Sequence, residues 1–222
     1  MIILFYGKGL DISSTTHKSN QLMDYINKHI RKRDYKLSTN IALLNIDMQK
    51  YFCDESSNAY IHNTPDIIEN INKLSYIFSD RSLPIISTKH INDSESSAMM
   101  SKWWRDIITI DSPLSHLDKR INVERSYIIE KSQYDAFYKT DLLDLLKSLN
   151  IEQIVITGVL THLCCETTAR SAFIHGFEVF FVIDATATYN YVYHNGSIIN
   201  LAHGFVHPVL TNNLINEIGC MK

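Results

Sequence analysis

Six short apolar runs alternate with helical patterns along most of this 222-residue chain, and this alternation restricts its fold more than any other feature. The runs lie at residues 41–47, 84–90, 127–132, 153–159, 178–184 and 207–211. Most of them lack a polar residue at every second position, which is typical of strands buried on both faces of a parallel sheet. The helical patterns lie at residues 66–79, 141–149, 162–175 and 194–205. Such spacing predicts βαβ units and an open three-layer α/β/α domain.

Two segments do not follow this alternation. Residues 1–40 contain a short amphipathic helical pattern with polar flanks, and we expect an N-terminal arm that packs on the main domain, residues 41–222, or on a partner subunit. Residues 91–126 lack a clear strand and contain both tryptophans, Trp103 and Trp104. A long insertion of this kind is typical of a lid or an oligomer contact, and both roles stay open.

Composition and charge restrict the partners. Hydrophobic residues make up 45% of the chain, as in ordinary globular proteins, and a net charge of −3 provides no electrostatic attraction for nucleic acid or an anionic membrane. The four cysteines form no CxxC pair and are too few for a disulfide framework. The apolar start, MIILFY, is too short for a signal peptide or a membrane span. We therefore expect a cytoplasmic protein that binds neither nucleic acid nor membrane. The possible subunit contacts of the arm and of residues 91–126 favour a homo-oligomer, and the expected partner, from the residues discussed next, is a small-molecule substrate.

Chemically useful residues stand at the ends of neighbouring predicted strands. The first strand ends at Asp47, the second at His90 and the third at Lys131. The fourth leads into GVLTHLCCETTAR, which contains Cys164 and Cys165. Because ligands of an open parallel sheet bind at the carboxyl ends of its strands, we expect these residue types to meet at one edge.

A cysteine acts as a nucleophile in its thiolate form, which needs stabilisation at neutral pH. For Cys164 we expect the thiolate to be stabilised by the N-terminus of the following helix, with Thr161 as the N-cap, and by the charge of Lys131. Asp47 would serve as the general base and return the proton to a leaving amine. Cys, Lys and Asp in this arrangement are sufficient for acyl transfer from an amide.

The helical spacing distinguishes the two adjacent cysteines. Residues on the face of Cys164 are largely polar, whereas those on the face of Cys165 are small or apolar. A free cysteine packs well as a small buried hydrophobe. We therefore expect Cys164 to face the strand-end cleft and Cys165 to lie in the core.

Four motifs lie at the predicted strands and their ends: IALLNIDMQKYF, IIEKSQYDAFYKTDL, GVLTHLCCETTARSAF and FEVFFVIDATATY. Together they resemble the isochorismatase-like cysteine hydrolases, and the similarity covers roughly residues 40–217. The resemblance implies a six-stranded parallel, Rossmann-like sheet between layers of helices. It also implies that Asp47 is the acid of the family's DMQ motif, Lys131 its lysine and Cys164 its nucleophile.

The resemblance has further implications for the site. The Val159–Leu160 peptide bond would be cis, and the backbone N–H groups of Leu160 and Cys164 would form an oxyanion hole. Cys164 would form a thioester, with Asp47 moving the protons and Lys131 stabilising the ionised pair. Residues just past the strands are candidates for the substrate pocket, although aromatic residues at such places more often serve packing. These candidates are Gln49, Phe52, His90, Tyr134 and Phe137.

The sequence departs in two places from the patterns of known subfamilies, and these departures restrict the cofactor and the substrate class that we expect. Nicotinamidase-type members have a metal site marked by Asp-x-His after the second strand, but STKHIND has no acid two residues before His90. We therefore expect no metal or other cofactor, and nicotinamide is disfavoured as a substrate. Members that cleave a vinyl ether lack the cysteine, so Cys164 favours an amide, ureido or carbamoyl C–N bond. Two alternatives stay open: vinyl-ether hydrolysis with Asp47 as general acid, and a binding or scaffold module without turnover.

Overall fold

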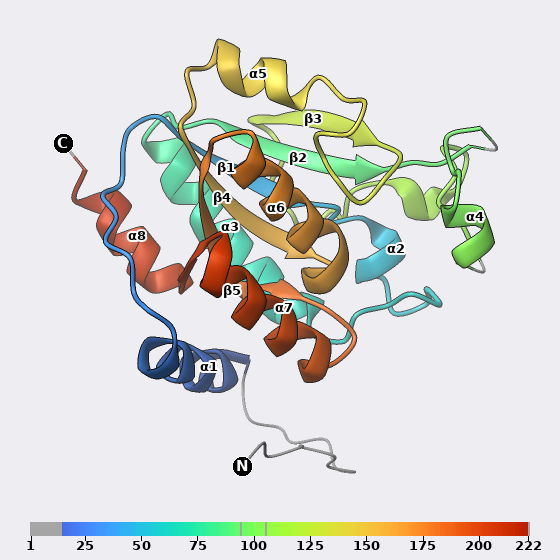
Figure 1. Ribbon diagram of the computed structural model, residues 1–222. Helices are drawn as coiled ribbons and strands as arrows, with labels where there is room; N and C mark the ends of the chain where they lie inside the picture. The colour runs from blue at the N-terminus through green and yellow to red at the C-terminus, as the bar shows by residue number, and fades with distance from the viewer. Residues whose placement is uncertain (1–14, 94, 105, 222) are drawn as a thin grey trace.

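One parallel sheet forms the centre of the molecule. The computed structural model describes residues 15–93, 95–104 and 106–221 of the chain. Its strands are β1 (Ile41–Ile46), β2 (Ile85–His90), β3 (Ser126–Lys131), β4 (Gln153–Val159), β5 (Glu178–Ala187) and β6 (His207–Val209). They are ordered β3-β2-β1-β4-β5-β6, and all neighbours are parallel (Figure 1). Each strand overlaps one predicted run, so the predicted sheet is confirmed.

Helices cover both faces of the sheet, which confirms the three-layer architecture (Figure 1). The helices of one face are α1 (Thr15–His29), α5 (Leu142–Ser148), α6 (Glu166–Ile174) and α7 (Tyr191–Gly204). Those of the other are α2 (Lys50–Cys53), α3 (Thr64–Asp80) and α8 (Thr211–Gly219). The sequence analysis did not predict α8, whose buried Leu214 and Ile218 complete the second face.

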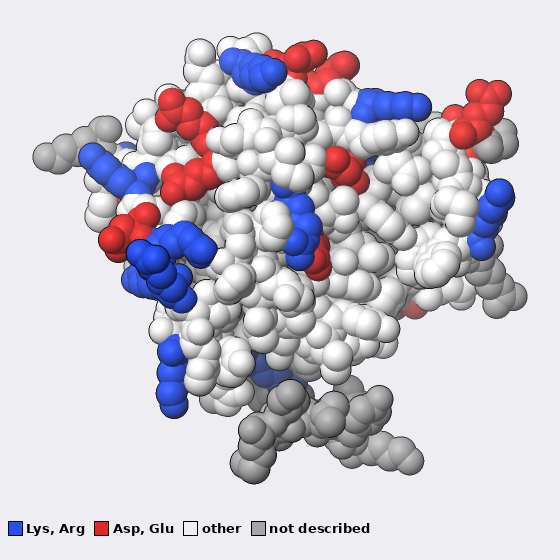
Figure 2. Space-filling model, in the orientation of Figure 1, with Lys and Arg blue, Asp and Glu red and all other residues white. Residues whose placement is uncertain are grey.

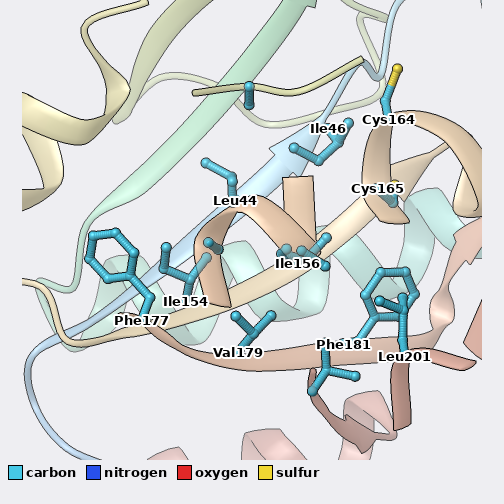
Figure 3. Close-up of a cluster of buried hydrophobic side chains, with 14 of the residues drawn as sticks. Leu44, Ile46, Ile154, Ile156, Cys164, Cys165, Phe177, Val179, Phe181 and Leu201 are labelled. Carbon is cyan, nitrogen blue, oxygen red and sulfur yellow. The ribbon is translucent and has the colours of Figure 1, made fainter. Parts of the chain in front are cut away.

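The absence of polar alternation in the strands follows from this layering. Side chains of a strand point alternately to its two faces. In β1, Leu44 packs in the core under α6 and α7, whereas Leu43 packs in the core under α3. Both positions are fully buried. Figure 3 shows the first of these cores, in which Cys165 lies beside the apolar side chains while the sulfur of Cys164 points away from them.

The described part of the predicted arm is built into the main fold. Leu22 and Ile26 of α1 are buried in the core that also contains Val206 and Phe181. The amphipathic pattern therefore packs on the same chain. Residues 1–14 of the arm lie outside the described residues, and its boundary at residue 40 stays a prediction.

The insertion between β2 and β3 contains little regular structure. Its described parts include α4 (Met100–Trp103) and a 3₁₀ turn at Pro113–Ser115. Trp103 is 74% exposed, whereas the indole N–H of Trp104 donates to the hydroxyl of Tyr134 over 2.6 Å. The two tryptophans therefore differ: one faces outward and the other contacts the loop that follows β3.

Surface charge is mixed on the face seen in Figure 2, where basic and acidic residues are interspersed. Among the described residues, no helix is long and apolar enough to cross a membrane. The expectations about nucleic acid, oligomerisation and cellular compartment stay predictions.

Gly158 permits a close approach between β4 and β1. Its φ is +109°, and an added Cβ would lie 2.1 Å from the carbonyl oxygen of Ile46. We expect Gly158→Ala to lower the free energy of unfolding by about 3 kcal/mol, because it adds a backbone clash to an unfavourable φ. For a chain of this size, that corresponds to a fall in Tm of about 6–12 °C.

Gly176→Ala is the matched control for this prediction. Gly176 also has a positive φ, +90°, but no atom of the described residues lies within 4 Å of its added Cβ. Calorimetry should give a loss of about 1 kcal/mol for this variant. Equal losses for the two variants would contradict a role for the contact with Ile46.

The sheet order determines where a site can form. From the centre, the chain builds outward through β1, β2 and β3 on one side and through β4, β5 and β6 on the other. Between β1 and β4 the direction of winding reverses, and ligands of such sheets bind at the carboxyl ends of the strands there.

Candidate active site

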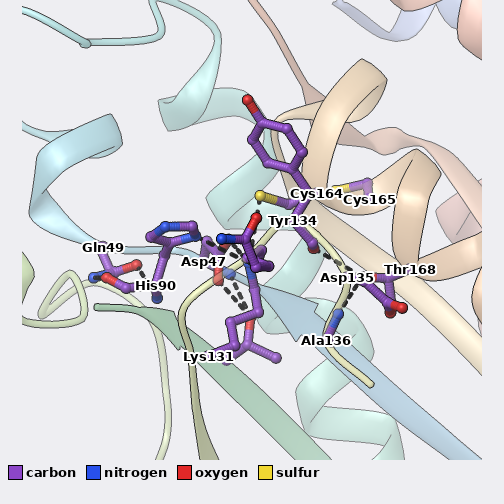
Figure 4. A network of polar contacts seen from close by, with 12 residues as sticks. Asp47, Gln49, His90, Lys131, Tyr134, Asp135, Ala136, Cys164, Cys165 and Thr168 are labelled. Atoms are coloured by element: carbon purple, nitrogen blue, oxygen red, sulfur yellow. Dashed lines mark hydrogen bonds and ion pairs between the residues drawn. The ribbon is translucent and has the colours of Figure 1, made fainter. Parts of the chain in front are cut away.

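Asp47, Lys131 and Cys164 come together at the carboxyl ends of β1, β3 and β4 (Figure 4). Lys131 Nζ lies 2.7 Å from Asp47 Oδ2 and 3.4 Å from Cys164 Sγ. The three residues are 0%, 3% and 4% exposed, respectively. Residues separated by up to 117 positions in sequence thus form one buried cluster, at the edge where the strand ends were expected to meet.

β2 orients the carboxylate of Asp47. The residue directly follows β1 with a φ of +49°, a left-handed conformation that aspartate tolerates better than most residues. Its backbone N–H donates to Thr88 Oγ1 over 3.0 Å, and the Thr88 hydroxyl donates to Asp47 Oδ1 over 2.6 Å. One carboxylate oxygen is thereby held by β2 while the other faces Lys131.

The turn that carries Cys164 differs from the prediction. Thr161–Cys165 forms a π-helical turn, in which the N–H of Cys165 donates to the carbonyl oxygen of Leu160 over 3.2 Å. The hydroxyl of Thr161 is within 3.0 Å of His194 Nδ1, so α7 uses the group that was expected to cap the helix. The predicted Thr161 N-cap is therefore wrong, because Leu160 occupies the cap position. The Val159–Leu160 peptide bond is cis, as the resemblance implied.

Burial and neighbouring charges set the protonation states of the site. Burial, with the charge of Asp47 and a hydrogen bond to that carboxylate, raises the pKa of the Cys164 thiol to about 12, although the charge of Lys131 acts to lower it. Burial alone would lower the pKa of Lys131, but Asp47 and Cys164 raise it on balance. At neutral pH the cluster therefore holds a Cys164 thiol and a Lys131 ammonium, and Asp47 lies beside them in the place of a proton acceptor.

Asp47, His90 and Cys164 also have the donor types of a metal site, with ligand atoms all within 4.8 Å of one another. The Lys131 ammonium, however, lies within 3.4 Å of an atom of each of them. The cation among these donors is thus the lysine side chain, and a metal ion would have to displace it from a buried ion pair. We assign no metal to this cluster.

The five candidates for the substrate pocket have different surroundings. Phe52 and Phe137 lie in the two hydrophobic cores, and Phe137 stacks on Phe177. The Gln49 amide donates to the carbonyl oxygens of His90 and Ser115 and accepts from the N–H of His90. These three side chains are therefore engaged in structural contacts.

The other two candidates stand beside the reactive cluster. His90 is buried, with Nδ1 3.4 Å from Lys131 Nζ. Tyr134 is half-buried near Cys164 in Figure 4, and its hydroxyl accepts the hydrogen bond of Trp104. Cys165 is fully buried, and its sulfur lies 3.9 Å from the carbonyl oxygen of Thr157, as its apolar helix face predicted.

Some side chains that bind those of Asp47, His90 or Tyr134 were absent from the sequence-based candidates. Thr88 binds Asp47, Asn92 binds His90, and Trp104 binds Tyr134. The sequence does contain a signal for Thr88 and Asn92. Together with His90 they occupy every second position along and just past β2, and such positions point to the same face of the sheet. Nothing local marks Trp104, whose partner lies 30 residues away.

A family model and several known proteins match most of this chain, and they agree on its family. The model of the isochorismatase domain matches residues 41–213. Nicotinamidase 3 of Arabidopsis thaliana is 36% identical over 184 residues, which cover 81% of this chain and 88% of that protein. The isochorismatase of Bacillus subtilis (strain 168) is 26% identical over 180 residues, covering 80% of this chain and 57% of that protein.

A solved structure has the same fold. The cysteine hydrolase from Pseudomonas syringae pv. phaseolicola 1448A superposes with a TM-score of 0.82 at 24% identity. The superposition covers 86% of this chain and 99% of that structure.

Proposed function

This chain belongs to the isochorismatase family and is a hydrolase, and from that premise we propose that it cleaves an amide, ureido or carbamoyl C–N bond of a small molecule through a thioester on Cys164. The observation that supports this most directly is the 3.4 Å distance between the Cys164 sulfur and the Lys131 ammonium. The same ammonium is paired with the carboxylate of Asp47. A nucleophile, a proton acceptor and a stabilising cation are thus within one cluster.

The first half of the proposed reaction is acylation. Asp47 takes the thiol proton as the sulfur attacks the carbonyl carbon, and Lys131 stabilises the thiolate. In our proposal the N–H groups of Leu160 and Cys164 donate to the developing oxyanion. When the tetrahedral intermediate collapses, the C–N bond breaks and Asp47 gives its proton to the leaving nitrogen. The products are a thioester and a free amine.

The second half is hydrolysis of the thioester. Asp47 takes a proton from water, whose oxygen attacks the same carbonyl carbon. The C–S bond then breaks, and the proton returns from Asp47 to the sulfur. The net reaction consumes one water and leaves the acid and the amine, with Cys164 again a thiol.

Vinyl-ether hydrolysis with Asp47 as general acid is the second candidate, supported by the 26% identity with a protein named isochorismatase. This chemistry needs no sulfur nucleophile. A module without turnover is set aside, because the family assignment indicates a hydrolase.

A substrate screen tests the proposal. It should compare small amides, ureas and carbamoyl compounds with isochorismate, using wild type, Cys164→Ala and Asp47→Asn. Nicotinamide belongs in the set because a relative with 36% identity is named nicotinamidase, although the sequence pattern disfavoured it.

We expect turnover of a C–N substrate by wild type and by neither variant. Isochorismate cleavage that survives Cys164→Ala but is lost in Asp47→Asn would favour the vinyl-ether alternative. Mass spectrometry of the enzyme mixed with its substrate should detect an acyl group on Cys164.

A further inference from the structure

The Lys131 ammonium has more hydrogen-bond acceptors than it has hydrogens. In the part of the chain that the structure describes, four acceptor atoms surround Nζ: Asp47 Oδ2 at 2.7 Å, the Gln133 carbonyl oxygen at 3.0 Å, and Cys164 Sγ and His90 Nδ1, both at 3.4 Å. An ammonium has only three N–H donors. The two short contacts take two of them, so the sulfur and the imidazole compete for the third.

The surroundings of His90 determine which of its nitrogens carries the proton. Asn92 Nδ2 donates to the carbonyl oxygen of Ser132 over 2.9 Å, so its Oδ1 is the atom that faces His90. That oxygen lies 2.8 Å from His90 Nε2 and can only accept, so Nε2 carries the hydrogen. His90 Nδ1 is therefore an unprotonated acceptor directed at Lys131.

Two further observations support this assignment. The backbone of His90 is fixed by Gln49, which accepts from its N–H over 2.7 Å and donates to its carbonyl oxygen over 3.0 Å. Burial and the charge of Lys131 lower the pKa of the His90 imidazole to about 4, so the ring is neutral at physiological pH. The imidazole is thus a neutral acceptor held in one place.

We propose that His90 is a positioning residue for Lys131, and that its Nδ1 accepts the third N–H of the ammonium whenever the Cys164 sulfur is acylated. The inference rests on the thioester chemistry proposed above. A thiolate is a charged acceptor and attracts that hydrogen strongly, whereas the sulfur of a thioester carries no charge and accepts only weakly. His90 then satisfies the ammonium, which stays in place beside Asp47 during hydrolysis.

This role gives His90 a specific kinetic signature. Without His90, the thiolate that forms during attack still accepts the third N–H of the ammonium, but the thioester that follows does not, so the cost falls on thioester hydrolysis. Acylation, which determines kcat/KM in a two-step mechanism, is unaffected because the sulfur then serves as acceptor. A residue needed only for correct folding would instead lower kcat/KM.

The experiment compares His90→Leu with His90→Asn, two side chains of similar size of which only asparagine supplies an acceptor. In His90→Leu, acylated Cys164 should disappear about tenfold more slowly by mass spectrometry, as for a lost hydrogen bond to a charged group. If hydrolysis limits turnover, kcat and KM should fall together. His90→Asn should restore the rate to within about threefold of wild type. An unchanged hydrolysis rate, a tenfold loss of kcat/KM, or equal defects in both variants would overturn the proposal.

A second measurement needs no substrate. In Cys164→Ala the competing sulfur is gone, so the third N–H should pass entirely to His90. The nitrogen-15 signal of His90 Nδ1, assigned by its loss in His90→Asn, should move upfield from its wild-type position. An unchanged signal would exclude this contact. If no acyl-enzyme forms with any substrate, the thioester function fails, and this measurement still decides whether His90 holds Lys131.

Discussion

Replacing Cys164 with alanine is expected to reduce turnover by about 10⁴-fold or more, since losing the nucleophile of such a cluster removes the covalent pathway altogether. The fold should survive, because the sulfur lies at the edge of a core and alanine fills most of the same space. Steady-state kinetics on the substrate found by screening measures the effect. Circular dichroism and Tm show whether the variant is folded.

Cys165→Ala is the control for this prediction. Its sulfur lies one residue away but packs in the core, beside the carbonyl oxygen of Thr157. We expect activity within about threefold of wild type and a stability loss of about 1 kcal/mol from the small cavity. If Cys165→Ala is inactive while Cys164→Ala turns over, the assignment of the nucleophile is wrong.

Asp47→Asn should have the second largest effect, a loss of about 10²–10⁴-fold in kcat. Asparagine has nearly the same shape and keeps a hydrogen-bonding side chain, but it cannot take the thiol proton or deliver it to the leaving nitrogen. The loss should appear with every C–N substrate. Activity retained within tenfold would contradict the role of Asp47 as proton carrier.

The same variant should change the ionisation of Cys164 in a defined direction. The negative charge of Asp47, and its hydrogen bond to the thiol, raise the pKa of Cys164. Their removal therefore lowers that pKa, while Lys131 still stabilises the thiolate. Titration by thiolate absorbance should show ionisation at lower pH than in wild type. If Asp47→Asn has more Cys164 thiolate but less activity than wild type, the activity is lost through proton transfer and not through formation of the nucleophile.

A double variant tests whether the Cys164 thiolate stabilises the buried Lys131 ammonium when the charge of Asp47 is removed. In Asp47→Asn the Cys164 thiolate can serve as the counter-ion of Lys131, but in Asp47→Asn/Cys164→Ala neither anion is left. Breaking a buried ion pair by removing a partner costs about 3–5 kcal/mol. Denaturant unfolding should show the larger loss for the double variant, and equal stabilities would argue against thiolate pairing.

Much of this architecture could be predicted because it depends on local patterns. Runs buried on both faces, such as Ile41–Ile46, have no polar alternation, and parallel strands must have helices between them. Parallel strands also have their carboxyl ends at one edge, so the nearness of Asp47, Lys131 and Cys164 followed from strand ends alone.

Other features depended on contacts between distant segments. The hydroxyl of Thr161 bonds to His194, 33 residues away, and so does not cap the helix. The Gln49 amide is taken by backbone groups of β2 and of the insertion, and Phe137 stacks in a core with Phe177. Each of these residues stood near a strand end, but its partner was not visible in the local sequence.

The sequence by itself determined the layers, the strand ends and the residue types that meet there, because periodicity and chain connectivity decide these. Only the tertiary structure decided which atoms face one another: the ammonium of Lys131 among four acceptors, and the imidazole of His90 turned by Asn92 to be one of them. Such choices depend on differences of a few tenths of an ångström in the distances between side chains such as those of Lys131 and His90, 41 residues apart, a scale that spacing along the chain does not specify.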